Sequence, residues 1–240
     1  MAAADFSWCR LLRLPDNAGF GAANNRGAEI ARGDLLLLLN SDAWLADGSS
    51  LPRLEESARR NPRLGLVVPQ IYFPDGRPQF SWCPETGVVG EALQIVRNRF
   101  ESSRFNHRYL PPLLKVLTGP GWHTAACMLI KKEAFDAVGG FDEGFFLYFE
   151  DVDLSRRLRL AGWKAALVHE SSAIHVKGGS QRSHQGEVAY RAAQLRYYRK
   201  HRPPWENRYL RARMQRKFAA VRDPELRREL LAVLERDRGS

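Results

Sequence analysis

The sequence predicts an α/β fold with a mainly parallel sheet, and two observations carry the prediction. Five consecutive leucines at residues 35–39 are typical of a strand buried on both faces, as parallel strands are. Apolar segments then alternate along the chain with segments of helical spacing, which is the pattern of helices packed on a sheet. The 240 residues are enough for one sizeable α/β domain and an appendage.

Each expected helix is marked by its spacing or by its ends. Gly33 closes the first helix, and an Asp-Gly-Ser-Ser segment opens the second. Gly162 follows a helix whose apolar residues Val152, Leu154, Leu158 and Ala161 follow helical spacing. The chain from residue 183 onwards reads as a helical tail that is broken at Pro203. The expected helices of the first part cover residues 24–32, 47–60, 91–100, 132–138 and 150–161.

The expected strands are short apolar runs between turn signals. A loop over residues 15–21 precedes the first helix, and the Pro-Asp-Gly sequence within residues 73–78 predicts a turn after the third strand. The aromatic and basic stretch of residues 104–109 reads as a surface loop. The expected extended segments cover residues 10–14, 35–39, 64–72, 124–131, 164–169 and 172–176.

The formal charge of +10 lies mainly in the tail, where residues 181–240 hold 16 Lys and Arg against 7 Asp and Glu. We therefore divide the chain into residues 1–180, an α/β domain, and residues 181–240, a basic helical tail. Such a tail could meet an anionic membrane surface or nucleic acid, or it could be an ordinary solvated helical surface. Three widely spaced cysteines fit a reducing, cytoplasmic location, and residues 1–5 do not read as a secretory signal.

Two acidic positions stand out by their place in the expected fold. Asp42 follows the leucine strand, and ligands of open α/β sheets bind at the carboxyl ends of strands. A carboxylate there could hold a divalent cation, or it could simply cap the following turn. Glu150 and Asp151 open a helix, where the dipole favours ionised carboxylates, so they could also be ordinary first-turn acids.

Two further segments could contact a ligand. His175 ends a short strand, where an imidazole could bind a metal ion or hydrogen-bond within the protein. In the loop that starts at Asn17, Gly19 permits close backbone approach, and the helix after it offers free N–H groups to an anion. Trp122 could stack on a sugar face or pack in the core.

Three segments together resemble the family-2 glycosyltransferases, which have the nucleotide-diphospho-sugar transferase (GT-A) fold. They are DNAGFGAANNRG at residues 16–27, LLLLLNSD at residues 35–42 and GFDEGFFLYFEDVDLSRR at residues 140–157. Within that family the chain is most similar to the rhamnosyltransferase branch. The family's opening strand–helix–strand unit has no counterpart here, so we expect an N-terminally truncated fold in which the leucine strand has an unpaired edge.

The resemblance implies a role for each of these positions. Asp151 would be the general base, with Asp153 supporting it, and Asp42 and His175 would bind Mg²⁺ or Mn²⁺. Asn40 stands where the family has the first Asp of its Asp-X-Asp pattern, so it would offer a neutral carbonyl or a ribose hydrogen bond. The remaining expected contacts are Asn17, Gly19, Asn24 and Arg26 to the nucleotide sugar, and Trp122 and Glu150 to the acceptor.

The resemblance thus implies an inverting transfer of a sugar, such as rhamnose from dTDP-rhamnose, to a hydroxyl of a cell-surface glycan or a lipid-linked saccharide. The tail's aromatic residues would hold the enzyme against the inner membrane surface.

Two alternatives stay open. One is a catalytically incomplete remnant that binds sugars or partners. The other is a nucleic-acid binder, which would lose affinity steeply with salt; we expect no nucleic-acid partner.

Overall fold

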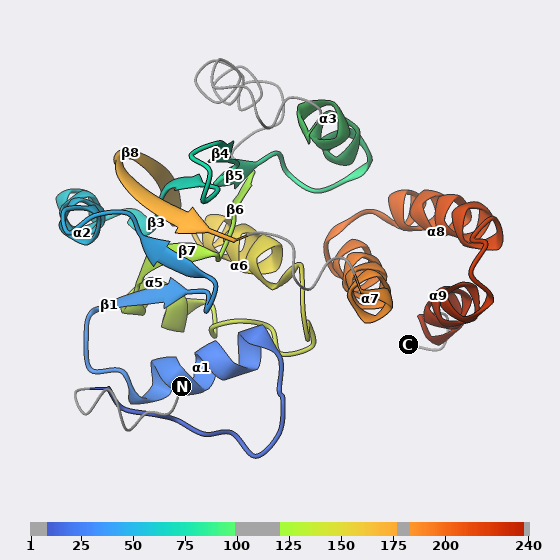
Figure 1. Ribbon diagram of the computed structural model, residues 1–240, viewed down its shortest axis with the longest axis horizontal. Helices are drawn as coiled ribbons and strands as arrows, with labels where there is room; N and C mark the ends of the chain where they lie inside the picture. The colour runs from blue at the N-terminus through green and yellow to red at the C-terminus, as the bar shows by residue number, and fades with distance from the viewer. Residues whose placement is uncertain (1–8, 99–120, 177–182, 238–240) are drawn as a thin grey trace.

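The computed structural model describes residues 9–98, 121–176 and 183–237. The expectations for residues 99–120 and 177–182, which include the surface loop and the domain boundary at residue 180, lie outside this part. Figure 1 shows a central sheet with helices on both of its faces and three further helices, α7 to α9, to one side. The α/β class predicted from the sequence is therefore confirmed.

The sheet has the order β1-β7-β3-β8-β2, and β4 is added to β3. Strands β3 and β8 pair in parallel, whereas the other pairs are antiparallel. Strands β1, β3 and β8 share one direction, and β7 runs against it between β1 and β3. A second, two-stranded sheet joins β5 and β6. The strands are β1 (Leu35–Leu39), β2 (Ala43–Leu45), β3 (Leu64–Tyr72), β4 (Pro78–Gln79), β5 (Trp82–Cys83), β6 (Trp122–His123), β7 (Cys127–Lys131) and β8 (Lys164–His175).

The leucine strand β1 is only partly buried. Leu36 and Leu38 are in the core, but Leu35 and Leu37 are half-buried and Leu39 is exposed. Within the described residues β1 pairs with β7 along one side only. The expected position of the strand is confirmed, but the expected burial of both faces is wrong for an edge strand.

Eight helices in the described residues cover the sheet and extend beyond it. Helix α2 covers one face, where Leu54 and Ala58 pack on Val67, and α1, α5 and α6 cover the other, where Leu66 and Leu154 are buried. The helices are α1 (Phe20–Ile30), α2 (Ser50–Arg60), α3 (Val88–Asn98), α5 (Lys132–Ala137), α6 (Glu150–Leu160), α7 (His184–His201), α8 (Pro204–Ala219) and α9 (Pro224–Arg236).

The expectation of two separate strands at residues 164–169 and 172–176 was wrong, because β8 is continuous over both. Its pairing with β3 passes from Pro69–Val168 to Gln70–Ser172, so three residues of β8 bulge out without ending the strand. The polar residues of this bulge, His169, Glu170 and Ser171, resemble a turn in sequence. Ser171 is nevertheless buried, and its hydroxyl donates to the carbonyl of Ser50 on α2.

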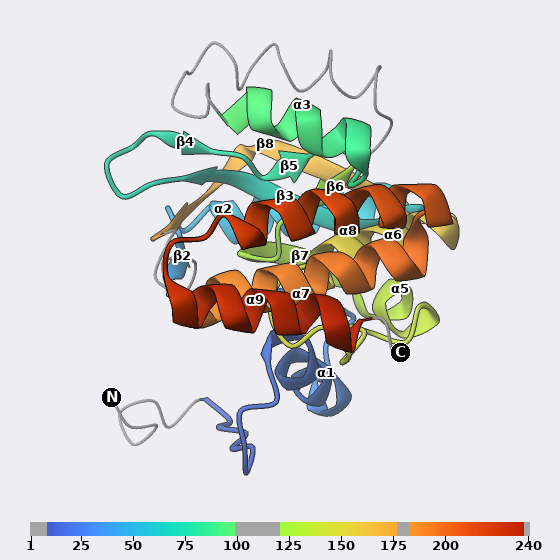
Figure 2. The same cartoon turned by 90° about the vertical axis from the view of Figure 1, so that its right-hand side faces the viewer.

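Helices α7, α8 and α9 form a layer that packs on the domain through its own apolar cluster (Figure 2). Tyr197 and Tyr198 are fully buried in this cluster, so they cannot be the membrane-facing aromatics that the sequence suggested. Trp205 and Tyr209 do remain exposed. In the described part of the chain, no helix combines the length and apolar character needed to cross a membrane.

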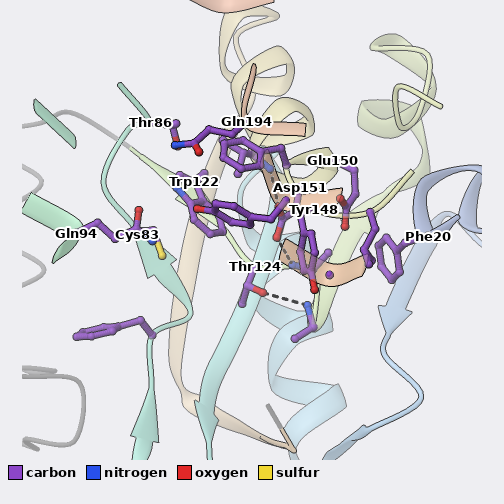
Figure 3. Close-up of a pocket in the computed structure, with 18 of the residues that line it drawn as sticks. Phe20, Cys83, Thr86, Gln94, Trp122, Thr124, Tyr148, Glu150, Asp151 and Gln194 are labelled. Carbon is purple, nitrogen blue, oxygen red and sulfur yellow. Dashed lines mark hydrogen bonds between the residues drawn. The ribbon is translucent and has the colours of Figure 1, made fainter. Parts of the chain in front are cut away.

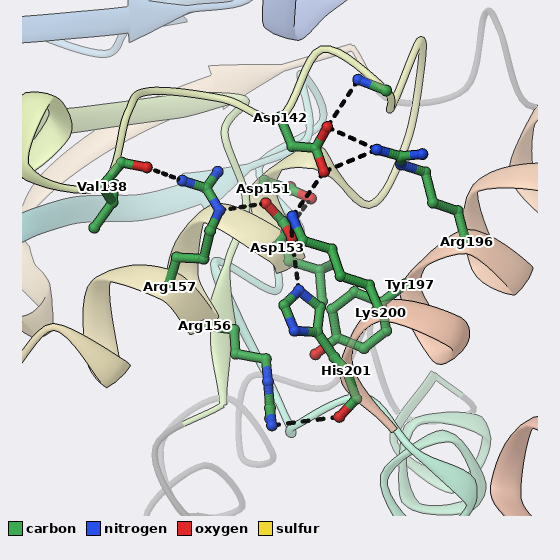
Figure 4. A network of polar contacts seen from close by, with 12 residues as sticks. Val138, Asp142, Asp151, Asp153, Arg156, Arg157, Arg196, Tyr197, Lys200 and His201 are labelled. Atoms are coloured by element: carbon green, nitrogen blue, oxygen red, sulfur yellow. Dashed lines mark hydrogen bonds and ion pairs between the residues drawn. The ribbon is translucent and has the colours of Figure 1, made fainter. Parts of the chain in front are cut away.

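A buried charge cluster fixes α7 to α6 (Figure 4). Asp153 is fully buried on α6 and contacts Lys200 at 2.7 Å, His201 at 2.6 Å and Arg157 at 2.6 Å. Burial alone would raise the pKa of Asp153, but the hydrogen bonds from His201 and Lys200 and the charge of Arg157 hold it far below its usual value. The tail is therefore joined to the domain by a specific ionic contact.

Candidate active site

A large pocket opens where β1 and β8 end and where α6 begins. It encloses about 1110 Å³ and extends from the strand ends to α3, α7 and α8. Several expected site residues line it, namely Asn24, Asn40, Asp42, Trp122, Glu150, Asp151 and His175. Figure 3 shows the part of the pocket around Trp122, Tyr148 and Asp151. The fold thus brings side chains from distant segments to one cavity.

Asp42 and His175 meet because β2 pairs with the end of β8. In the antiparallel register Ala43 lies opposite His175, and the N–H of Val176 donates to the carbonyl of Asp42 at 3.0 Å. As a result, Nε2 of His175 lies 3.4 Å from Oδ1 of Asp42. The side chain of Asp42 is 45% exposed, so its carboxylate remains open to a ligand.

Gln79 on β4 sets the orientation of the His175 ring. Its amide nitrogen donates to the carbonyl of His175 at 2.5 Å, which leaves Oε1 facing Nδ1 of the ring at 3.2 Å. An oxygen in that place makes Nδ1 the protonated nitrogen, so a neutral ring presents its Nε2 lone pair towards Asp42. Two lone pairs facing each other suit a cation bound between them.

The residues at this end therefore fit a divalent cation. A carboxylate oxygen and an imidazole nitrogen are ligands that Mn²⁺ and Mg²⁺ accept. Within the described ranges, no cluster of three or more His, Cys, Asp and Glu side chains is placed to hold a metal ion. The described residues would thus supply two ligands, and the phosphate oxygens of a substrate and water would complete the coordination.

Asp151 and Glu150 form a carboxylate pair at the first turn of α6. The backbone N–H groups of Ala125 and Val152 donate to the Asp151 carboxylate at 3.2 Å and 2.8 Å. Burial raises the pKa of Asp151 to about 6, against these two hydrogen bonds. Burial and the charge of Asp151 raise the pKa of Glu150 to about 8. At neutral pH the pair is then one ionised and one protonated carboxyl, which is a base beside an acid.

The turn before this pair has an unusual backbone. Tyr148 and Phe149 have φ angles of 69° and 64°, in the left-handed region that residues other than glycine rarely adopt. Each such residue costs on the order of 1 kcal/mol, and strain of this kind is concentrated at functional sites. The turn carries the chain into α6, so that Tyr148, Glu150 and Asp151 all line the pocket.

Three buried polar atoms of the pocket lining lack a hydrogen-bond partner among the described residues. They are Nε1 of Trp122, the hydroxyl of Tyr148 and Oε2 of Glu150. Buried polar groups are nearly always paired, so these three atoms would gain a partner if a polar ligand reached them. A sugar, with hydroxyls on every side, offers the matching donors and acceptors.

Other expected contacts do not reach this pocket. Oδ1 of Asn17 accepts from the N–H of Gly19 at 3.1 Å, so it holds the turn before α1. Gly19 has a φ of 84°, and a Cβ there would lie 2.2 Å from the carbonyl oxygen of Phe146. Arg26 ion-pairs with Glu29 at 2.8 Å on the surface. These three residues make contacts within the fold, and the nucleotide contacts expected of them stay predictions.

Asp153 lies in the α6–α7 contact and is absent from the pocket lining, and its expected support of Asp151 stays a prediction. Sequence reasoning missed Gln79 and Tyr148. The sequence around Gln79 does not mark it as a site residue, because its contact with His175 arises only when β4 pairs with the end of β3. Tyr148 lies directly before the Glu-Asp pair, so its position beside an expected base was a usable signal.

The fold is that of known glycosyltransferases. The crystal structure of GalNAc-T7 with UDP, GalNAc and Mn²⁺ matches with a TM-score of 0.52 and 16% identity, over 92% of this chain and 42% of that chain. The GT-A fold is therefore shown, and the site lies in a fold that holds sugar-transferring enzymes.

Sequence comparison identifies the family. Residues 2–139 match the model of glycosyl transferase family 2. The chain is 32% identical to N-acetylglucosaminyl-diphospho-decaprenol L-rhamnosyltransferase of Mycobacterium tuberculosis, over 71% of this chain and 60% of that protein. It is also 32% identical to the O-antigen biosynthesis protein RfbC of Myxococcus xanthus, over 72% of this chain and 13% of that protein. This chain belongs to glycosyl transferase family 2, and its matched part spans less than two thirds of either relative.

Proposed function

We propose that this chain is a metal-dependent inverting glycosyltransferase, which moves a sugar from a nucleoside-diphosphate sugar to a hydroxyl of an acceptor. One observation carries the proposal. The Asp42–His175 pair and the Glu150–Asp151 pair line the same pocket, although they come from segments far apart in the chain. The first pair fits a cation and a diphosphate, and the second fits proton transfer.

Asp151 acts as the general base. It takes the proton of the acceptor hydroxyl as that oxygen forms a bond to the anomeric carbon, while the bond from that carbon to the phosphate oxygen breaks. The nucleoside diphosphate leaves with the electron pair, and the configuration inverts. A pKa near 6 keeps Asp151 ionised at neutral pH but still basic enough to accept the proton.

Asp42 and His175 hold the leaving diphosphate end of the donor. A divalent cation bound to them supplies electrostatic stabilisation of the departing charge. Asn40 and Asn24 line this end of the pocket with neutral amides, which suit the hydroxyl groups of a ribose or sugar. Trp122, Tyr148 and protonated Glu150 line the pocket and would contact the transferred sugar or the acceptor.

The relatives' names support a narrower substrate. One is a rhamnosyltransferase that acts on N-acetylglucosaminyl-diphospho-decaprenol, and another is an O-antigen biosynthesis protein. We therefore propose rhamnose or a related hexose as the sugar, and a lipid-linked saccharide or a cell-surface glycan as the acceptor.

The proposal is tested by incubating the chain with dTDP-rhamnose, Mn²⁺ and a lipid-linked N-acetylglucosamine acceptor. We expect release of dTDP and a product whose anomeric configuration is inverted by NMR. Asp151→Asn should lower the rate by at least 100-fold. Asp136→Asn, at an exposed ion pair on α5, is the matched control. Donor binding without turnover, unchanged in Asp151→Asn, would favour a sugar-binding module instead.

A further inference from the structure

The pocket continues beyond the side chains that the proposed reaction uses. Its far end lies between α3, α7 and α8, where Arg191, Arg213 and Lys217 line it. Gly186 and Gln194 on α7 contribute further lining. The reaction as described assigns nothing to this end of the cavity.

Aromatic contacts connect this end with the turn that carries the base. Tyr190 packs edge-on against Tyr148 and Phe149, with ring centroids 5.6 Å and 5.3 Å apart. The guanidinium carbon of Arg191 lies 5.2 Å from the centroid of the Tyr190 ring. A single aromatic ring thus separates Arg191 from the residues directly before Glu150.

Arg191 is held in a fixed position. Its side chain is 14% exposed, and its guanidinium bonds to Glu187 at 2.8 Å and to Oε1 of Gln194 at 2.9 Å. A planar guanidinium fixed by neighbours on its own helix is prepared to bind phosphate oxygens with little loss of freedom. Arg213 and Lys217 project from α8 and are 41% and 62% exposed, so they lie nearer the solvent.

The far end carries an excess of positive charge. Among the described lining residues it holds three cations against two carboxylates, Glu91 and Glu187. Arg213 pairs with Glu91 at 2.8 Å, Arg191 pairs with Glu187 at 2.8 Å, and Lys217 lies 4.0 Å from Glu187, so one positive charge remains in excess. Burial, Arg191 and Arg213 lower the pKa of Lys217, whereas Glu187 raises it. Cations crowded at the wall of a cavity favour an anionic ligand.

We propose that Arg191, Arg213 and Lys217 form a binding subsite for the diphosphate group of the acceptor. The inference rests on the proposed function for the acceptor's identity. The acceptor's sugar then lies against Trp122 and Tyr148 with its hydroxyl at Asp151, while its diphosphate reaches the cations on α7 and α8. The lipid chain leaves the pocket beside the exposed side chains of α8.

Binding to the full chain tests the subsite without requiring turnover. Farnesyl diphosphate, inorganic pyrophosphate and farnesol are titrated calorimetrically in metal-free buffer. We expect both diphosphates to bind, farnesol to bind at least tenfold more weakly, and the Arg191→Gln/Lys217→Gln double variant to lose about tenfold in affinity for the diphosphates. Tighter binding of farnesyl diphosphate than of pyrophosphate would identify the lipid-linked form as the ligand.

Two controls separate this subsite from other anion sites. Arg216→Gln, on the same helix outside the pocket lining, should bind within twofold of the wild type. Asp42→Ala should also keep the affinity for farnesyl diphosphate, because the donor end is separate. Equal affinity of the double variant and the wild type would overturn the proposal. So would binding to vesicles containing phosphatidylglycerol without binding to either diphosphate.

The outcome is distinguishable from failure of the proposed function. If the chain turns over, the double variant should raise the KM for a diphosphate-linked acceptor about tenfold and leave the KM for a neutral alkyl glycoside unchanged. If the chain shows no transfer at all, the calorimetric comparison still decides whether the cations bind a diphosphate.

Discussion

Gln79 and His175 contact each other twice, once through the backbone carbonyl of the histidine and once through its ring, at 2.5 Å and 3.2 Å. The two contacts use both ends of one side-chain amide. One contact therefore fixes the position of β4 against the end of β8. The other fixes the ring orientation of His175, a candidate metal ligand. A residue of this kind affects a metal site without touching the metal.

Replacing Gln79 should weaken metal binding. We expect Gln79→Ala to raise the Kd for Mn²⁺ by 10-fold or more, because the His175 ring loses the oxygen that holds its Nδ1 proton; outer partners of metal ligands are typically worth ~10–100-fold. Electron paramagnetic resonance titration of Mn²⁺ measures this. Gln215→Ala, on the exposed side of α8, should leave the Kd unchanged. An unchanged Kd in Gln79→Ala would contradict the role.

The transfer rate should depend on pH through the carboxylate pair. Asp151 must be ionised to accept a proton, so the rate should rise as pH increases through about 6. Protonated Glu150 donates to the substrate, so the rate should fall as pH increases through about 8. Rate profiles between pH 5 and pH 9.5 check this shape. In Glu150→Gln the fall at high pH should disappear, and a persisting fall would assign it to another group.

The same Glu150→Gln substitution should stabilise the protein at high pH. In the folded protein the pKa of Glu150 is raised to about 8, whereas the unfolded chain loses this proton at lower pH. The free energy of unfolding of the wild type therefore falls as pH rises from the unfolded pKa to about 8. Glutamine has no charge to bury. We expect it to raise the free energy of unfolding at pH 8 by about 1–3 kcal/mol and to have little effect at pH 4. Urea unfolding at both pH values measures the difference; an equal effect at pH 4 and pH 8 would argue against the buried charge.

Removing Asp153 should destabilise the contact between α6 and α7. Asp153→Ala leaves Arg157, Lys200 and His201 without their buried partner, which costs about 3–5 kcal/mol. The pKa of Asp153 is lowered in the folded state, so its contribution is complete above the unfolded value and is lost as pH falls through the folded one. Urea unfolding at pH 7 is compared with Asp136→Asn, whose exposed pair should contribute under about 0.5 kcal/mol. Equal losses in the two variants would refute the assignment.

Tyr148→Phe should separate ligand binding from stability. The Tyr148 hydroxyl is buried without a partner in the described chain, so removing it costs no protein hydrogen bond and should leave the melting temperature unchanged or higher. If a sugar hydroxyl occupies that position, the KM for donor or acceptor should rise about tenfold. Thermal unfolding and initial-rate kinetics give the two values. A lower melting temperature with unchanged KM would assign the hydroxyl to the fold.

Much of the fold was predictable from local pattern. The strand at Leu64–Tyr72 and the helix ending at Arg60 lie where apolar runs and turn signals placed them. The bulge in β8 was not predictable, because its polar residues resemble a turn and are tolerated only through buried bonds to α2. The antiparallel β7 between β1 and β3 was not predictable either, since hydrophobic spacing carries no information about strand direction.

The sequence by itself determined the α/β class, the resemblance to a family, and three candidate residues, Asp42, Asp151 and His175, because each ends or begins a recognisable element. Only the tertiary structure decided which side chains share a cavity. It turned Arg26 to the surface, placed Gln79 against His175, and brought Arg191 and Lys217 from the tail to the pocket. The physical reason is that these contacts join segments many residues apart, so packing and strand pairing set them while local spacing does not.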